Sequence, residues 1–237
     1  MAQLKIHVDS RIADADSGFD TSTPVLRLGA AVSVIQSVLF VVIGVAALVL
    51  GVDQLVDDGF ASFARTDPAP FRILCAAFLL IAVLGLAITP AERTLIEPAN
   101  AGWARFGATL AYLGHAGTIA FFSWWLLTPT AQASSATNLD VIAPISLGVM
   151  FELVFVGAWV WIIAALMRTD STVPQGFLWL SVVKATAFWF TFVAFLTSEK
   201  WMLLGGLGAV TFVAGPLWHL WVARIMITRA GKPARAG

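Results

Sequence analysis

The sequence predicts an all-α polytopic membrane protein: a bundle of six transmembrane helices with both termini in the cytoplasm. Of the 237 residues, 59% are hydrophobic and only 12% are charged, and the mean hydropathy is +0.87. A soluble domain carries about a quarter charged residues. Six apolar segments are each long enough to cross about 30 Å of hydrocarbon at 1.5 Å per residue. Finally, Lys and Arg gather on one side of these segments, which sets the orientation.

The six apolar segments are separated by polar or turn-forming stretches. These read DPAP at 67–70, TPAER at 89–93, TPTAQASSATN at 128–138, TDSTVPQG at 169–176 and SEK at 198–200. The last stretch is so short that it predicts an antiparallel hairpin between the fifth and sixth spans. The expected spans are Leu28–Gly51, Phe71–Thr89, Arg105–Leu127, Val141–Met167, Gly176–Thr197 and Trp201–Ile227.

The chain ends are polar. Residues 1–26 are rich in Asp, Ser and Thr and predict a mobile cytoplasmic tail ahead of the transmembrane domain, which we place at 27–228. Because this polar leader is long and the first apolar run is longer than a signal core, the first span is not a cleaved signal. Residues 229–237 form a short basic tail. Between the first two spans, residues 52–63 have apolar side chains at helical spacing and predict an interfacial helix.

Basic residues give the orientation. The side that holds both termini carries ten of them, whereas the opposite side carries three. An excess of Lys and Arg marks the cytoplasmic side. The ten are Lys5, Arg11, Arg27, Arg93, Arg105, Arg168, Arg224, Arg229, Lys232 and Arg235, and the three are Arg65, Arg72 and Lys200.

Tryptophans lie mainly at the two expected membrane surfaces, as in an aromatic belt. We interpret seven of them in this way. Trp189 is an exception, because it lies near the middle of the fifth span; packing is its expected function, since it does not share a helix face with Lys184. The seven are Trp124, Trp125 and Trp201 at the outer surface, and Trp103, Trp179, Trp218 and Trp221 at the inner one.

Four ionisable residues lie well inside the spans, each on a different helix: His115, Glu152, Lys184 and His219. Charges at this depth cost several kcal/mol, so they face the bundle interior and find partners. We therefore expect one buried polar layer, with an ion pair between Glu152 and Lys184. Its members either fix helix register or line a cavity that binds a small polar solute or relays protons.

Three further residues are expected to support this layer. Tyr112 lies one helical turn from His115. Ser181 and Thr191 share an arc of the fifth span with Lys184 and form a polar stripe.

More specific chemistries meet obstacles in the sequence. Haem b needs two histidines facing each other at one depth, and His115 and His219 differ in expected depth by about 7 Å. A zinc site from His115, Glu152 and His219 lacks supporting ligand spacing. Retinal needs a Schiff-base lysine in the last of seven spans, whereas Lys184 is in the fifth of six. The serine motif of rhomboid proteases is missing, and no phosphate-binding loop is present. We predict no catalytic residue and no metal site.

Other features exclude further classes. Net charge is zero, which gives no indication of nucleic-acid binding. Cys75 is the single cysteine and lies in an apolar run, so it forms no internal disulfide and is expected to be a packing residue. Glycines at 205, 206, 208 and 215 permit close helix packing, either within the chain or in self-association.

Two stretches resemble a known family. They are WVWIIAALMRTDSTVPQGF at the end of the fourth span and GPLWHLWVARIM in the sixth. In these stretches the chain resembles the uncharacterised six-span bacterial proteins grouped as domain-of-unknown-function family 4386. The resemblance implies a bacterial polytopic membrane protein and assigns no site residues.

Together these observations predict a multi-pass protein of the bacterial inner membrane that is not an enzyme. The leading hypothesis is that it handles a small polar solute or protons through the polar layer. One alternative is a structural or accessory subunit that binds other membrane subunits; another is a haem b electron-transfer protein.

Overall fold

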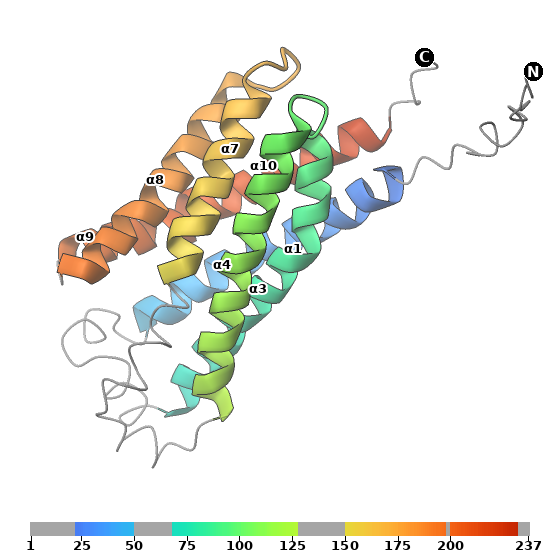
Figure 1. Cartoon of the computed structure of the whole chain (residues 1–237). Helices are drawn as coiled ribbons and strands as arrows, with labels where there is room; N and C mark the ends of the chain where they lie inside the picture. The colour runs from blue at the N-terminus through green and yellow to red at the C-terminus, as the bar shows by residue number, and fades with distance from the viewer. Residues whose placement is uncertain (1–21, 50–67, 128–149, 198–199, 232–237) are drawn as a thin grey trace, which may run out of the picture.

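The computed structural model describes residues 22–49, 68–127, 150–197 and 200–231, and all of them lie in helices or in the turns that join helices. The predicted all-helical, multi-pass architecture is confirmed in this part of the chain (Figure 1). The helical segments are α1 (Ser22–Val49), α3 (Pro68–Ile96), α4 (Ala101–Leu127), the π-helix η2 (Glu152–Val156) followed by α7 (Gly157–Met167), α8 (Gln175–Thr197), and α9 (Lys200–Gly208) followed by the π-helix η3 (Ala209–Ala214) and α10 (Gly215–Ala230).

Five of these segments are long and apolar enough to span a membrane, counted over the described residues. The fourth is shorter, Glu152–Met167, because residues 141–149 of the predicted span lie outside the described part. Three other predictions also fall there: residues 1–21 of the mobile tail, the interfacial helix at 52–63, and the link at 198–199. The tail was predicted to extend to residue 26, which is wrong for residues 22–26, because α1 begins at Ser22. The hairpin of the last two spans is nevertheless visible, since α8 packs along α9 and η3.

The predicted end of the second span at Thr89 is wrong. Helix α3 continues through Pro90 to Ile96, so TPAER is helical and not a connection. Proline leaves one carbonyl without its backbone donor, but this turn still buries Ala91, Leu95 and Ile96 in the core. Apolar burial thus outweighs the local preference for a break.

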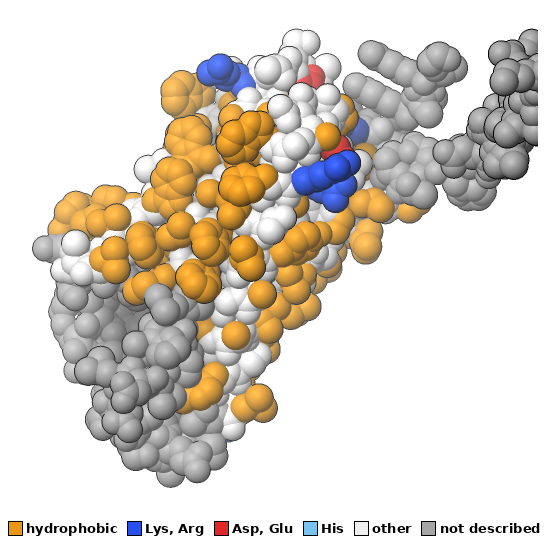
Figure 2. Space-filling view, in the orientation of Figure 1, with side chains coloured by type: hydrophobic (Ala, Val, Ile, Leu, Met, Phe, Trp, Pro, Cys, Tyr) orange, Lys and Arg blue, Asp and Glu red, His pale blue; other side chains and the backbone are white. Residues whose placement is uncertain are grey.

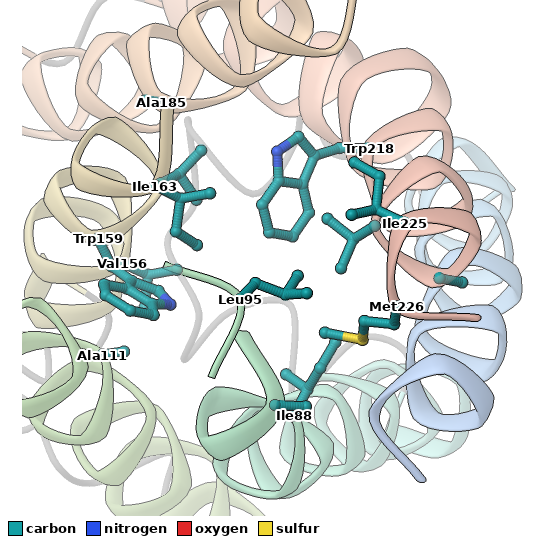
Figure 3. Packing of buried hydrophobic residues seen from close by; sticks show 14 of the residues in the cluster. Ile88, Leu95, Ala111, Val156, Trp159, Ile163, Ala185, Trp218, Ile225 and Met226 are labelled. Atoms are coloured by element: carbon teal, nitrogen blue, oxygen red, sulfur yellow. The ribbon is translucent and has the colours of Figure 1, made fainter. Parts of the chain in front are cut away.

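The segments form a closed ring. Helix α1 packs against α3, α3 against α4, α4 against η2 and α7, and α7 against α8. Helix α8 packs against α9 and η3, and α10 closes the ring by its long contact with α1. Figure 3 looks into the ring, where buried side chains such as Ile88 of α3, Ile163 of α7 and Trp218 of α10 point inward from different helices.

Small residues set how closely the helices approach. At Gly29 in α1, a Cβ atom would lie 2.2 Å from the Cβ of Ala91 in α3 and 3.0 Å from the Sδ of Met226 in α10. Only glycine fits at this meeting point of three helices. Ala104, Ala108 and Ala111 line one buried face of α4 in the same way.

The outer surface of the bundle is apolar. Large hydrophobic side chains on the helices are exposed, and Figure 2 shows hydrophobic side chains spread over the coloured part of the visible face, with the charged side chains in its upper part. A soluble protein rarely exposes so large an apolar surface. The bundle therefore contacts a lipid bilayer.

Charged side chains gather at one end, which we call the arginine end. It comprises the α3–α4 turn, the α7–α8 turn and the C-terminal end of α10. There Arg229 of α10 donates to the carbonyl of Leu95 at 2.6 Å and pairs with Asp170 of the α7–α8 turn. These bonds connect α10 to the end of α3 and to the α7–α8 turn.

The α3–α4 turn adds a second charged group to the arginine end. Glu97 lies 3.0 Å from Arg93 and 3.5 Å from Arg105. The hydrogen bond from Arg93 holds the pKa of the Glu97 carboxyl below its usual value. The ionised Glu97 carboxylate therefore stabilises the folded protein at neutral pH, and this stabilisation is lost as the pH falls through the lowered pKa.

Candidate functional site

A small polar cavity lies inside the ring. The volume in which the centre of a water molecule fits is ≈ 20 Å³, which is room for about one water. Side chains from all six helical segments line it. The polar ones are Gln36 of α1, Glu92 of α3, His115 of α4, Glu152 of η2, Lys184 of α8, and Trp218 and His219 of α10.

Glu152 binds two residues of α4. Its Oε1 lies 3.0 Å from Nδ1 of His115, and its Oε2 accepts a hydrogen bond from Thr118 Oγ1 at 3.0 Å. An ionised carboxylate can only accept hydrogen bonds, so the proton of this His115 contact belongs to Nδ1. The pair can hold a proton on either member with little movement of heavy atoms.

Two glycines allow this arrangement. A Cβ on Gly85 of α3 would lie 2.4–2.6 Å from three atoms of the His115 ring. A Cβ on Gly114 of α4 would lie 3.2 Å from the carbonyl oxygen of Phe151 and 3.3 Å from Cα of Glu152. Small side chains at these positions therefore bring α3, α4 and η2 close enough for the His115–Glu152 contact.

The backbone at Glu152 is π-helical, a form that appears mostly as single turns, frequently at functional sites. The carbonyl of Val154 within this turn accepts a hydrogen bond from the indole Nε1 of Trp189 at 3.2 Å. Trp189 therefore packs against η2, and the contacts of Lys184 with aromatic rings do not include it. This agrees with the packing function expected from its position.

Lys184 forms the second polar pair. Its Nζ lies 3.0 Å from Nε2 of His219, and both side chains are buried. An ammonium group only donates, so Nε2 of His219 accepts and the imidazole proton lies on Nδ1. This contact too can pass a proton between its members.

Aromatic rings surround the Lys184 ammonium. Nζ lies 3.7 Å from the ring centroid of Trp218, and Phe40 and Phe188 lie at 5.7 and 6.0 Å. Such cation–π contacts partly replace the lost water. The interpretation of Trp218 as part of an aromatic belt is therefore wrong, because Trp218 is 1% exposed and faces the core.

The belt interpretation fails for a second tryptophan and fits three others. Trp125 is buried in a cluster with Phe71 and Phe121. Trp103, Trp179 and Trp201 are instead exposed, as an aromatic belt at a membrane surface requires.

The predicted ion pair between Glu152 and Lys184 is wrong. Among the described residues, Glu152 contacts His115 and Thr118, whereas Lys184 contacts His219. Spacing along each helix gives depth and face, but the partner across the ring depends on how the helices are packed. Lys184 still interacts electrostatically with Glu152 across the cavity, and with a second carboxylate, Glu92.

Glu92 is the ionisable residue that sequence reasoning missed. It is 4% exposed, and its Oε2 accepts a hydrogen bond from Trp159 Nε1 at 2.7 Å. It was assigned to a connection because Pro90 and Arg93 flank it. Its spacing from Ile88 and Ile96, one turn before and one turn after, places it on the same apolar face and was the available indication.

The three supporting residues have different positions. Tyr112 is 39% exposed and does not line the cavity, so its supporting role stays a prediction. Ser181 is buried, donates to the carbonyl of Phe177 and accepts from Trp218 Nε1 at 2.8 Å, which orients the ring over Lys184. Thr191 is buried but bonds to Ala187 and packs against Gly206.

Within the described part of the chain, the buried polar atoms without a hydrogen-bond partner include Ser33 Oγ, Gln36 Oε1 and His219 Nδ1. Gln36 and His219 both line the cavity. Buried polar groups are nearly always satisfied, by ordered water if not by protein. The cavity is thus a natural place for a water molecule.

The site does not fit a haem. His115 is bonded to Glu152 and packed against Gly85, Nε2 of His219 faces Lys184, and the space between them holds about one water. Within the described ranges, no group of three or more His, Cys, Asp or Glu residues is placed to hold a metal ion.

The fold and the site define a class: a multi-pass helical membrane protein with buried ionisable residues. No protein-family model, curated protein or solved structure matches the chain. The resemblance to domain-of-unknown-function family 4386 stays a prediction.

Proposed function

We propose that this protein conducts protons through its buried polar layer and catalyses no covalent chemistry. The observation that supports this most directly is the arrangement of two proton-sharing pairs, His115–Glu152 and Lys184–His219, around one cavity. Intramembrane ionisable residues of this kind mark proton and ion pathways. Because the cavity has room for about one water, protons suit it better than a solute.

The chemistry needs only groups that accept and release protons. In one pair an imidazole contacts a carboxylate, and in the other an imidazole contacts an ammonium group. A water in the cavity, bonded to free acceptors such as Gln36 Oε1, would connect the two pairs. The apolar shell of Phe40, Phe188 and Trp159 excludes further solvent.

The arginine end faces the cytoplasm in this proposal, and the membrane is the inner membrane of a bacterium. The excess of basic residues on that side supports the orientation. The accessory-subunit alternative stays a prediction, supported by the sequence alone.

Proton flux into liposomes tests the proposal. Purified protein is reconstituted with a pH-sensitive dye inside, and a potassium diffusion potential drives protons. Flux should exceed that of protein-free liposomes. Glu152→Gln should lower it about tenfold or more, because the amide still bonds to His115 and Thr118 but takes up no proton.

Glu97→Gln is the matched control, since it removes a carboxylate at the arginine end outside the cavity. Its flux should equal that of the wild type. Wild-type flux no higher than the protein-free background would contradict the proposal.

A further inference from the structure

Glu92 has no place in the two proton-sharing pairs, yet it lines the same cavity. Within the described part of the chain it forms no ion pair, and its Oε2 accepts a hydrogen bond from the indole Nε1 of Trp159. A carboxyl group buried in this way is costly unless charge or hydrogen bonds compensate. Because burying this carboxyl group is energetically unfavourable, its presence in a small polar cavity indicates a function.

Groups on several elements face Glu92. Lys184 of α8 and His115 of α4 act on it electrostatically, and Tyr112 of α4 interacts with it from the outer face. Glu152 and His219 line the same cavity from η2 and α10, and α1 contributes the neutral Gln36. Lys184 is the only Lys or Arg among the described residues lining the cavity, so its charge is shared between two carboxylates.

These groups lie at successive depths from the arginine end. Measured along each helix from its end at the arginine end, Glu92 lies about 6 Å deep, Lys184 about 13 Å and His219 about 16 Å. His115 and Glu152 lie about 21–22 Å deep. Glu92 is therefore the cavity group nearest to the arginine end, separated from it by a single turn of α3.

Building on the proposed function, we infer that Glu92 exchanges protons between the arginine end and the buried pairs. The proton moves from bulk water to a Glu92 carboxylate oxygen, and then through cavity water to the Lys184–His219 pair and to Glu152–His115. Each step moves one proton between existing acceptors, so no other reactant is needed. The Trp159 hydrogen bond fixes the Glu92 carboxyl toward the cavity.

The test combines flux with substitutions of different severity. In liposomes, Glu92→Gln should lower proton flux about tenfold, Glu92→Asp should retain part of it because it keeps a carboxyl group, and Glu97→Gln should leave it unchanged. Equal flux for wild type and Glu92→Gln would overturn this inference and leave the proposed function intact. Absence of wild-type flux would overturn both.

Infrared difference spectroscopy gives a readout that does not need the Glu92→Gln variant to fold. Wild-type protein is compared at two pH values, and the carboxyl C=O stretching band is followed. Trp159→Phe removes the indole donor but keeps an aromatic ring, so it should shift the pH-dependent band of Glu92. If Trp159→Phe shifted none of the pH-dependent carboxyl bands, Glu92 would not be among the groups that exchange protons, and the inference would be overturned.

Discussion

Lys184→Met should destabilise the protein by about 3–5 kcal/mol, because it leaves two buried carboxylates without the cation that they share. For a chain of this size, thermal unfolding in detergent should then occur at a temperature lower by roughly 10 °C. Methionine keeps the volume and the contact with Trp218, so lost packing contributes little.

Arg224→Met is the matched control for this substitution. It removes a positive charge and introduces the same side chain at an exposed position of α10. Its unfolding temperature should stay close to that of the wild type. An equal loss in both variants would show that the charge of Lys184 has no special importance for stability.

Double variants tell which carboxylate depends on Lys184. Lys184→Met is combined with Glu92→Gln or with Glu152→Gln. If the lysine balanced the charge of that carboxylate, the double variant should be more stable than Lys184→Met alone. Glu152 keeps His115 as a second partner, so we expect the larger recovery with Glu92→Gln.

Gly85→Ala should destabilise the protein by about 1–3 kcal/mol, because the new methyl group would overlap the His115 ring. To relieve the overlap, the imidazole must leave its position against Glu152. We therefore expect a lower unfolding temperature together with reduced proton flux in liposomes.

Gly205→Ala provides the control for Gly85→Ala. A Cβ at Gly205 of α9 meets no atom within 4 Å. Alanine is favoured over glycine in a helix by about 0.5–1 kcal/mol, so this variant should be as stable as the wild type or slightly more stable. If Gly85→Ala behaved in the same way, the close contact between α3 and the His115 ring would be disproved.

Hydropathy predicted the helices well because the free energy of placing a segment in lipid depends mainly on its own composition. The beginning of α8 and the end of α4 were placed within one residue. The predicted end of the second span at Thr89 was wrong because it depends on packing between helices and not on the composition of the segment itself. A proline followed by two charged residues resembles a connection locally, but the ring packs Leu95 and Ile96 beyond it.

The sequence predicted four of the ionisable residues that line the cavity, but it missed Glu92 and did not predict which residues contact each other. His115, Lys184 and His219 are rare polar residues in apolar spans, which is visible without any structure. Which of them touch depends on the rotation of each helix and on contacts such as Gly85 with His115. Small residues allow such contacts, but not every glycine makes one, since a Cβ at Gly205 or Gly208 would meet no atom within 4 Å.

The π-helical segments have a consequence for how the chain tolerates changes in length. A π turn contains one residue more than the corresponding α turn, and one residue corresponds to about 100° of rotation about the helix axis. A chain lacking one residue of η2 would form a regular helix, with everything before the deletion rotated against α7. Glu152 would then face a neighbour other than His115. Deletions and insertions in η2, or in η3 ahead of His219, should therefore be much more harmful than substitutions at the same places.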